Sequence, residues 1–140
     1  MGSIFSFLFG GGNAAAAGEY ASDGISGVTA FHSAARWQLH YNTVKDSQQL
    51  MVVDFAASWC GPCKLMEPAV HAMAAKFTDV QFAKIDVDEL PEVAQEFGVQ
   101  AMPTFVLVKR GKEVDRVVGA KKDELEKKVA KHREAPSASI

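Results

Sequence analysis

The chain is poor in cysteine: its 140 residues include only Cys60 and Cys63. A small secreted scaffold held by disulfides needs several cysteine pairs, so that class is excluded. A tetrahedral zinc site needs four ligands, and only His71 lies near this pair in the sequence, which disfavours a metal site. A single Cys-x-x-Cys pair fits a redox-active dithiol in a reducing compartment better than a structural bridge.

Basic residues near the N-terminus and long apolar runs are also lacking. No lysine or arginine precedes Arg36, so a secretory signal and an Arg-rich transit peptide both fit poorly. No apolar run is long enough to span a bilayer. The net charge is −2 without a basic stripe, which argues against a nucleic-acid partner. The remaining composition, 48% hydrophobic and 23% charged, is typical of one globular domain with an extension.

Residues 1–27 differ in composition from everything that follows. Residues 10–18 contain only glycine, alanine and one asparagine, which predicts a flexible arm. The first six residues, MGSIFS, match the pattern for N-myristoylation of Gly2. One myristoyl chain gives only reversible membrane binding, and the arm has neither a cysteine nor a basic patch to strengthen it. We therefore expect a cytoplasmic protein with peripheral attachment to an endomembrane or the plasma membrane; the alternative is an unmodified arm.

The central stretch of the chain leads from a strand pattern directly into a helix pattern. Residues 51–57 form a short apolar run, typical of a strand buried on both faces. Asp54 interrupts this run, and a carboxylate there is costly to bury without a partner or a task. After Cys60, apolar residues recur at the spacing of one helix face: Met66, Ala69, Val70, Met73, Ala74 and Phe77. Cys60 therefore lies where the strand gives way to the helix.

This position at a helix start accounts for the chemistry expected of Cys60. Unpaired N–H groups and the positive end of the helix dipole favour a thiolate there and lower the pKa of the thiol. Cys63 lies one turn later on the same face, within reach of Cys60. We expect Cys63 to be more buried and less acidic, suited to resolving a mixed disulfide. Pro62 is tolerated in the first helical turn, and Gly61 leaves room for another backbone.

The other segments alternate between strand and helix patterns. Further strands are expected over residues 28–31, 80–87, 104–108 and 113–118, and further helices over residues 34–46, 90–98 and 121–133. This order predicts an α/β fold, a mixed sheet of four to five strands with helices on both faces. The expected domain covers residues 28–133, and we expect residues 134–140 to form a disordered tail.

Several motifs together resemble the thioredoxin family, and its plant h-type branch in particular. The matching stretches are Val53-Asp54-Phe55, Trp59-Cys60-Gly61-Pro62-Cys63-Lys64, Lys84-Ile85-Asp86-Val87-Asp88, Ala101-Met102-Pro103-Thr104-Phe105 and Val118-Gly119-Ala120. The sequence Ala57-Ser58-Trp59 and the N-terminal arm carry the h-type resemblance. The chain departs from the family at Ala56, where many bacterial members have a second tryptophan. The resemblance implies the thioredoxin fold, with strands around Cys60 and Pro103 at its centre.

The resemblance also implies a role for each site residue. Cys60 would attack a disulfide of a target protein, and Cys63 would resolve the mixed disulfide. Asp54 would be a buried acid of raised pKa that relays a proton to and from Cys63, with Lys84 as a second buried charge that modulates it. Pro103 would be cis. The implied substrate-binding surface comprises Trp59, Gly61, Pro62, Ala101, Met102, Gly119 and Ala120.

The implied function is the reduction of protein disulfides. No bound cofactor or metal is expected beyond the redox-active Cys60–Cys63 disulfide, and the implied electron source is NADPH through a flavoprotein thioredoxin reductase. The expected partners are that reductase and disulfide-containing target proteins. Two alternatives remain: an oxidase or isomerase of the same fold, and a non-catalytic, membrane-tethered interaction module. The sequence Gly61-Pro62 favours reduction, because oxidising relatives usually carry histidine before the second cysteine.

Overall fold

The computed structural model describes residues 27–133; Gly2, nearly all of the predicted arm and the predicted tail lie outside the described residues. The strands are β1 (Val28–Phe31), β2 (Met51–Ala56), β3 (Gln81–Asp86), β4 (Thr104–Lys109) and β5 (Lys112–Val118). The helices are α2 (Ala34–Lys45), α3 (Gly61–Lys76), α4 (Pro91–Glu96) and α5 (Lys122–His132). The predicted order of elements is confirmed, and their bounds differ from the prediction by at most two residues.

The strands form one mixed sheet with β2 at its centre. The spatial order is β1-β3-β2-β4-β5; β3 is parallel to β1 and β2, whereas β4 is antiparallel to β2 and β5. All six residues of β2 are buried, as expected of a continuous apolar run at the centre of a sheet. Within this register, Asp54 lies opposite Lys84 of β3 and Phe105 of β4.

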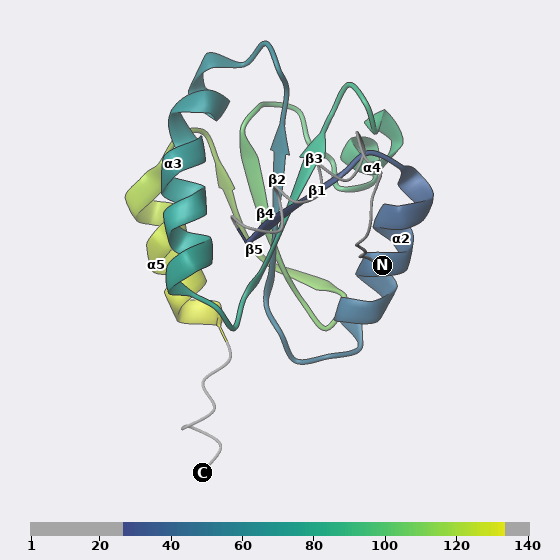
Figure 1. Ribbon diagram of the computed structural model, residues 1–140, viewed down its shortest axis with the longest axis vertical. Coiled ribbons are helices and arrows are strands. Elements are labelled where there is room, and N and C mark those ends of the chain that lie inside the picture. The colour runs from purple at the N-terminus through teal and green to yellow at the C-terminus, as the bar shows by residue number, and fades with distance from the viewer. Residues whose placement is uncertain (1–26, 134–140) are drawn as a thin grey trace, which may run out of the picture.

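Two layers of helices cover the sheet, and Figure 1 shows α3 and α5 on one side and α2 and α4 on the other. Because side chains alternate along a strand, neighbouring residues of β2 enter different cores. Val52 packs in the core beneath α3 and α5, whereas Val53 and Phe55 pack in the core beneath α2 and α4. The α3 side of β2 is therefore the side on which Asp54 lies.

Local sequence signals begin the helices and close the hairpin. Ser33 caps α2, with its Oγ accepting a hydrogen bond from the Arg36 N–H at 3.2 Å. Pro68 lies inside α3, and the helix continues beyond it to Lys76. Arg110 and Gly111 join β4 to β5 with φ angles of 56° and 78°, the left-handed conformation that a two-residue hairpin turn needs.

Candidate functional site

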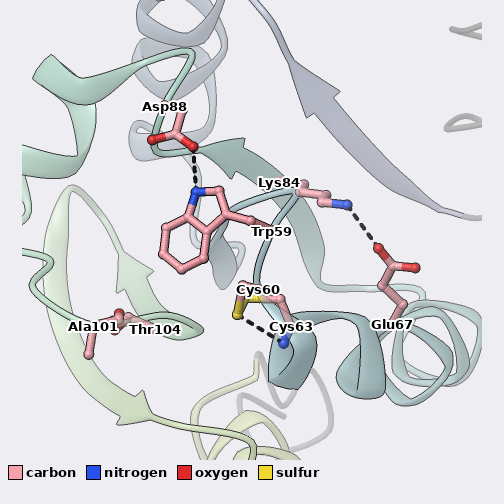
Figure 2. Close-up of a disulfide and its surroundings, with 8 residues drawn as sticks. All are labelled: Trp59, Cys60, Cys63, Glu67, Lys84, Asp88, Ala101 and Thr104. Atoms are coloured by element: carbon pink, nitrogen blue, oxygen red, sulfur yellow. Dashed lines mark hydrogen bonds and ion pairs between the residues drawn. A yellow bond between two sulfur atoms is a disulfide. The ribbon is translucent and has the colours of Figure 1, made fainter.

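A disulfide joins Cys60 and Cys63 where β2 gives way to α3. Cys60 is the N-cap residue of α3, and its Sγ accepts a hydrogen bond from the Cys63 N–H at 3.2 Å (Figure 2). The two Cα atoms are 5.3 Å apart, a distance that suits a disulfide without backbone movement. A sulfur at this position faces the unpaired N–H groups of the first helical turn, which stabilise a thiolate when the bond is reduced.

The prediction that Cys63 is the more buried cysteine is wrong. Cys60 is 4% exposed and Cys63 is 6% exposed, so both lie under the surface to the same extent. The reason is the cap geometry, because it turns the Cys60 side chain back toward the helix. Both cysteines then pack in one small cluster with Ala56, Ala57 and the partly buried Val87 and Met102.

Asp54 is a buried acid without a hydrogen-bonding partner. The residue is only 8% exposed, and its Oδ1 is the one buried side-chain polar atom of residues 27–133 that lacks a hydrogen bond. Burial raises the pKa of this carboxyl from 3.8 to about 7; the charge of Lys84 opposes the rise and that of Glu67 adds to it. An acid with this pKa exchanges a proton readily at neutral pH.

Lys84 differs from the prediction that it is a second buried charge. Its side chain is 36% exposed, and its Nζ lies 3.2 Å from Oε2 of Glu67 in α3 (Figure 2). The charged head of a long lysine reaches the rim of the sheet while its stem stays on the strand. Lys84 nevertheless acts on Asp54 through its charge, because the two residues lie opposite each other in the sheet.

Trp59 lies on the surface next to the disulfide and is 66% exposed. Its Nε1–H donates a hydrogen bond of 2.8 Å to Oδ2 of Asp88, from the turn that follows β3 (Figure 2). A hydrogen bond at one edge limits the orientations that an otherwise exposed indole can adopt. The ring therefore presents an apolar surface beside Cys60.

The segment before β4, residues 101–103, also packs against the cysteines. The Met102–Pro103 peptide bond is cis, as the resemblance implies, and Met102 packs against the cluster that contains both cysteines. The Thr104 hydroxyl donates to the Ala101 carbonyl at 2.6 Å, and the Gly119 N–H donates to the Pro103 carbonyl at 2.8 Å. The first bond closes the turn before β4, and the second joins that turn to the segment after β5. Residues 101–103 and 119–120 therefore lie next to each other.

The remaining predicted surface residues are open to solvent. Gly61, Pro62, Ala101 and Ala120 are exposed, and Gly119 is half-buried. A Cβ added at Gly61 would meet no heavy atom within 4 Å, so the space beside the first cysteine is free. The structure thus gathers the predicted surface from three segments, around residues 59–62, 101–103 and 119–120, but the binding role itself stays a prediction.

The sequence did not indicate two residues that the structure brings to this site. Glu67 engages Lys84 and Asp88 engages Trp59. Glu67 lies four residues after Cys63, one helical turn further along α3, and that spacing is the signal that could have identified it. Asp88 belongs to a matched motif, but nothing in the motif indicates its hydrogen-bonding partner. Residues 27–133 contain no cluster of three or more His, Cys, Asp and Glu side chains arranged for a metal ion. Across the same residues, no helix combines the length and hydrophobicity needed to span a bilayer.

Comparisons with known proteins cover the whole of this site. A family model described as thioredoxin matches residues 31–131. Thioredoxin H2 of Arabidopsis thaliana is 64% identical over 133 residues, which cover 95% of this chain and 99% of that protein. Thioredoxin H2-1 of Oryza sativa subsp. japonica is 54% identical over 124 residues, 89% of this chain and 88% of that protein. The crystal structure of thioredoxin NaTrxh from Nicotiana alata is similar with a TM-score of 0.76 and 74% identity, over 76% of this chain and 93% of that one.

Proposed function

The chain belongs to the thioredoxin family, and we propose that its Cys60–Cys63 pair reduces disulfides in target proteins. Members of this family are protein-disulfide oxidoreductases, and the chain has their redox-active cysteine pair. The observation that carries the proposal is the position of the pair. Cys60 caps α3, and the backbone N–H of Cys63 meets its sulfur.

The first step is the attack of the Cys60 thiolate on a target disulfide. A bond forms between Cys60 Sγ and one target sulfur, and the other target sulfur leaves as a thiolate. The N–H groups of the first turn of α3 hold the negative charge on Cys60 before the attack.

The second step needs a base for Cys63. Its thiol loses a proton and attacks Cys60 Sγ, which re-forms the intramolecular disulfide and releases the second target sulfur as a thiolate. Two electrons have then passed from the dithiol to the target. Asp54 supports this step as the proton acceptor, because its raised pKa of about 7 lets the carboxylate take up a proton near neutral pH.

The target segment would bind beside the disulfide as an extended chain. Met102 next to cis-Pro103 offers backbone groups at one side, and the open space at Gly61 admits a second backbone. Trp59 adds an apolar surface held by Asp88. Backbone hydrogen bonds make few demands on side chains, so this surface suits many different proteins. Gly119 and Ala120 complete its rim.

We expect a thioredoxin reductase, which draws electrons from NADPH, to reduce the Cys60–Cys63 disulfide again after each turnover. The family membership supports this partner. Reduction is the favoured direction, since a thioredoxin-like couple with a potential of about −270 mV that reduces a target of about −200 mV gains roughly 3 kcal/mol.

The N-terminal arm bears on where the protein is located in the cell. The sequence around Gly2 supports N-myristoylation, and one acyl chain supports reversible attachment of a cytoplasmic protein to a membrane. Intact mass spectrometry of the protein from a eukaryotic host checks this. A mass increased by one myristoyl group is expected, and Gly2→Ala should abolish the increase. Cleavage of the arm near Ala17 would instead support the secretory oxidase alternative.

Trapping with Cys63→Ser tests the reductase function. The reduced variant, mixed with insulin as a disulfide substrate, is expected to accumulate a covalent adduct through Cys60 that a small thiol releases. Cys60→Ser is the matched control; it should form no adduct and lose insulin reduction entirely. Equal trapping by both variants, or retained turnover in Cys60→Ser, would contradict the proposal. An interaction module would keep its binding partner in both variants.

A further inference from the structure

Three charged side chains from three elements lie close together where the first turns of α3 cover the sheet. Asp54 of β2 and Lys84 of β3 lie directly opposite each other in parallel strands. Val52 and Phe82, two residues earlier in each strand, pack in the core under α3 and α5, so Asp54 and Lys84 share that side of the sheet. Glu67 comes from α3 itself, one turn after Cys63.

The ammonium group pairs with only one of the two carboxylates. Lys84 Nζ lies 3.2 Å from Glu67 Oε2, and the ion pairs formed within residues 27–133 include none to Asp54. Oδ1 of Asp54 has no hydrogen-bonding partner at all. The cation nearest in the sheet is therefore directed toward the helix and away from the buried acid.

We propose that Glu67 is a positioning residue that engages the Lys84 ammonium and thereby leaves Asp54 without a direct counter-charge in its buried site. The inference rests on the proposed role of Asp54 as proton acceptor for Cys63. A lysine has a long, rotatable stem, so its ammonium can follow whichever carboxylate binds it better. Glu67 is half-exposed and pays little desolvation, which makes it the better partner at the rim.

The charged groups that act on Asp54 are few. Lys84 faces it from β3 and Glu67 from α3, while β4 presents the apolar Phe105. Cys63 in the first turn of α3 adds a titratable thiol only after the disulfide is reduced. Burial raises the pKa of Asp54, Lys84 lowers it and Glu67 raises it. Removal of the Glu67 charge should therefore lower the pKa of Asp54 twice over, by loss of a like charge and by release of the ammonium.

Glu67→Gln tests the inference, with Glu126→Gln as the matched control. Glu126 of α5 also forms a partly exposed ion pair with a lysine, 2.6 Å from Lys76 at the C-terminal end of α3. The charges that act on Asp54 are those of Lys84 and Glu67, not that of Glu126. The chemical shift of the Asp54 carboxyl carbon is measured by NMR as a function of pH, which gives the midpoint of the Asp54 titration. The disulfide-bonded full chain is used, because no cysteine titrates in it. Glu67→Gln should move the midpoint down by about half to one pH unit, whereas Glu126→Gln should leave it in place.

The same substitution in a Lys84→Met background separates the positioning of the Lys84 ammonium by Glu67 from the direct effect of the Glu67 charge on Asp54. In a Lys84→Met variant no ammonium can be held, so Glu67→Gln should then shift the midpoint by less than half as much. No shift in Glu67→Gln, or an equal shift with and without Lys84, would overturn the inference. In the reduced protein, the pH profile of Cys63-dependent release from a mixed disulfide should follow the same downward shift. The NMR titration needs no turnover, so failure of this inference is distinguishable from failure of the reductase function.

Discussion

The two faces of β2 differ in the polarity of the side chains that they bury. On the α2 and α4 side, Met51, Val53 and Phe55 are fully buried in an apolar core, and Phe55 contacts Phe97 with ring centroids 5.4 Å apart. On the α3 side, Asp54 is buried without a hydrogen bond to Oδ1. One face of the strand is therefore wholly apolar, whereas the other carries a costly acid next to the apolar Val52.

This difference shows how the fold can accommodate the free-energy cost of burying the Asp54 carboxyl. A buried carboxyl whose pKa rises from 3.8 to about 7 costs about 4 kcal/mol when it is ionised. The opposite face carries a group of aromatic rings in mutual contact, and their burial offsets such a cost: Phe31, Trp37, Tyr41, Phe55 and Phe97. Because side chains alternate between the two faces of β2, the buried acid and the aromatic core lie on opposite sides of the sheet.

Truncation of the apolar face should have the largest effect on stability. Phe55→Ala removes a fully buried ring and should lower the free energy of unfolding by about 3–5 kcal/mol, measured by denaturant titration of the disulfide-bonded protein. The titration midpoint of Asp54 should stay unchanged under conditions where the variant is folded. A shifted midpoint would show that the two faces are coupled.

Neutralising the acid should act in the opposite direction. The folded pKa of Asp54 lies above its unfolded value, so the folded state binds more protons between about pH 4 and pH 7 and loses stability as the pH rises. Asp54→Asn, an isostere of the protonated acid, should match the wild type near pH 4. At pH 8 it should be more stable by as much as about 4 kcal/mol.

Denaturant titrations across that pH range check this prediction. The same variant should slow the release of target from the mixed disulfide at neutral pH. A constant stability difference between pH 4 and pH 8 would mean that Asp54 does not titrate in the folded state.

The smallest effect is expected at the exposed rim of the site. Asp88→Ala removes the acceptor for the Trp59 indole and should change the free energy of unfolding by less than about 1 kcal/mol, because the ring is mostly exposed. Its indole fluorescence should change, since the ring loses its fixed orientation. Asp88→Asn is the matched control, because its amide oxygen can still accept the bond. Identical spectra for both variants would contradict a role for this bond in orienting Trp59.

Much of the fold follows from patterns local in the sequence. The apolar run before the cysteines predicts β2, and the spacing of apolar residues after Cys60 predicts α3; the structure has both. These features depend on residues within a turn or a strand of one another. The contacts of Lys84 and Trp59 could not be predicted in this way, because their partners lie 17 and 29 residues away.

The sequence by itself determined that the only two cysteines stand at the start of a helix, directly after an apolar strand that contains one acid. Only the tertiary structure decided how deeply each cysteine lies and which carboxylate holds Lys84. The physical reason is competition. Burial and ion pairing depend on the distances between elements that meet only after folding, and Asp54 and Glu67 are both acids that a lysine on β3 can reach toward.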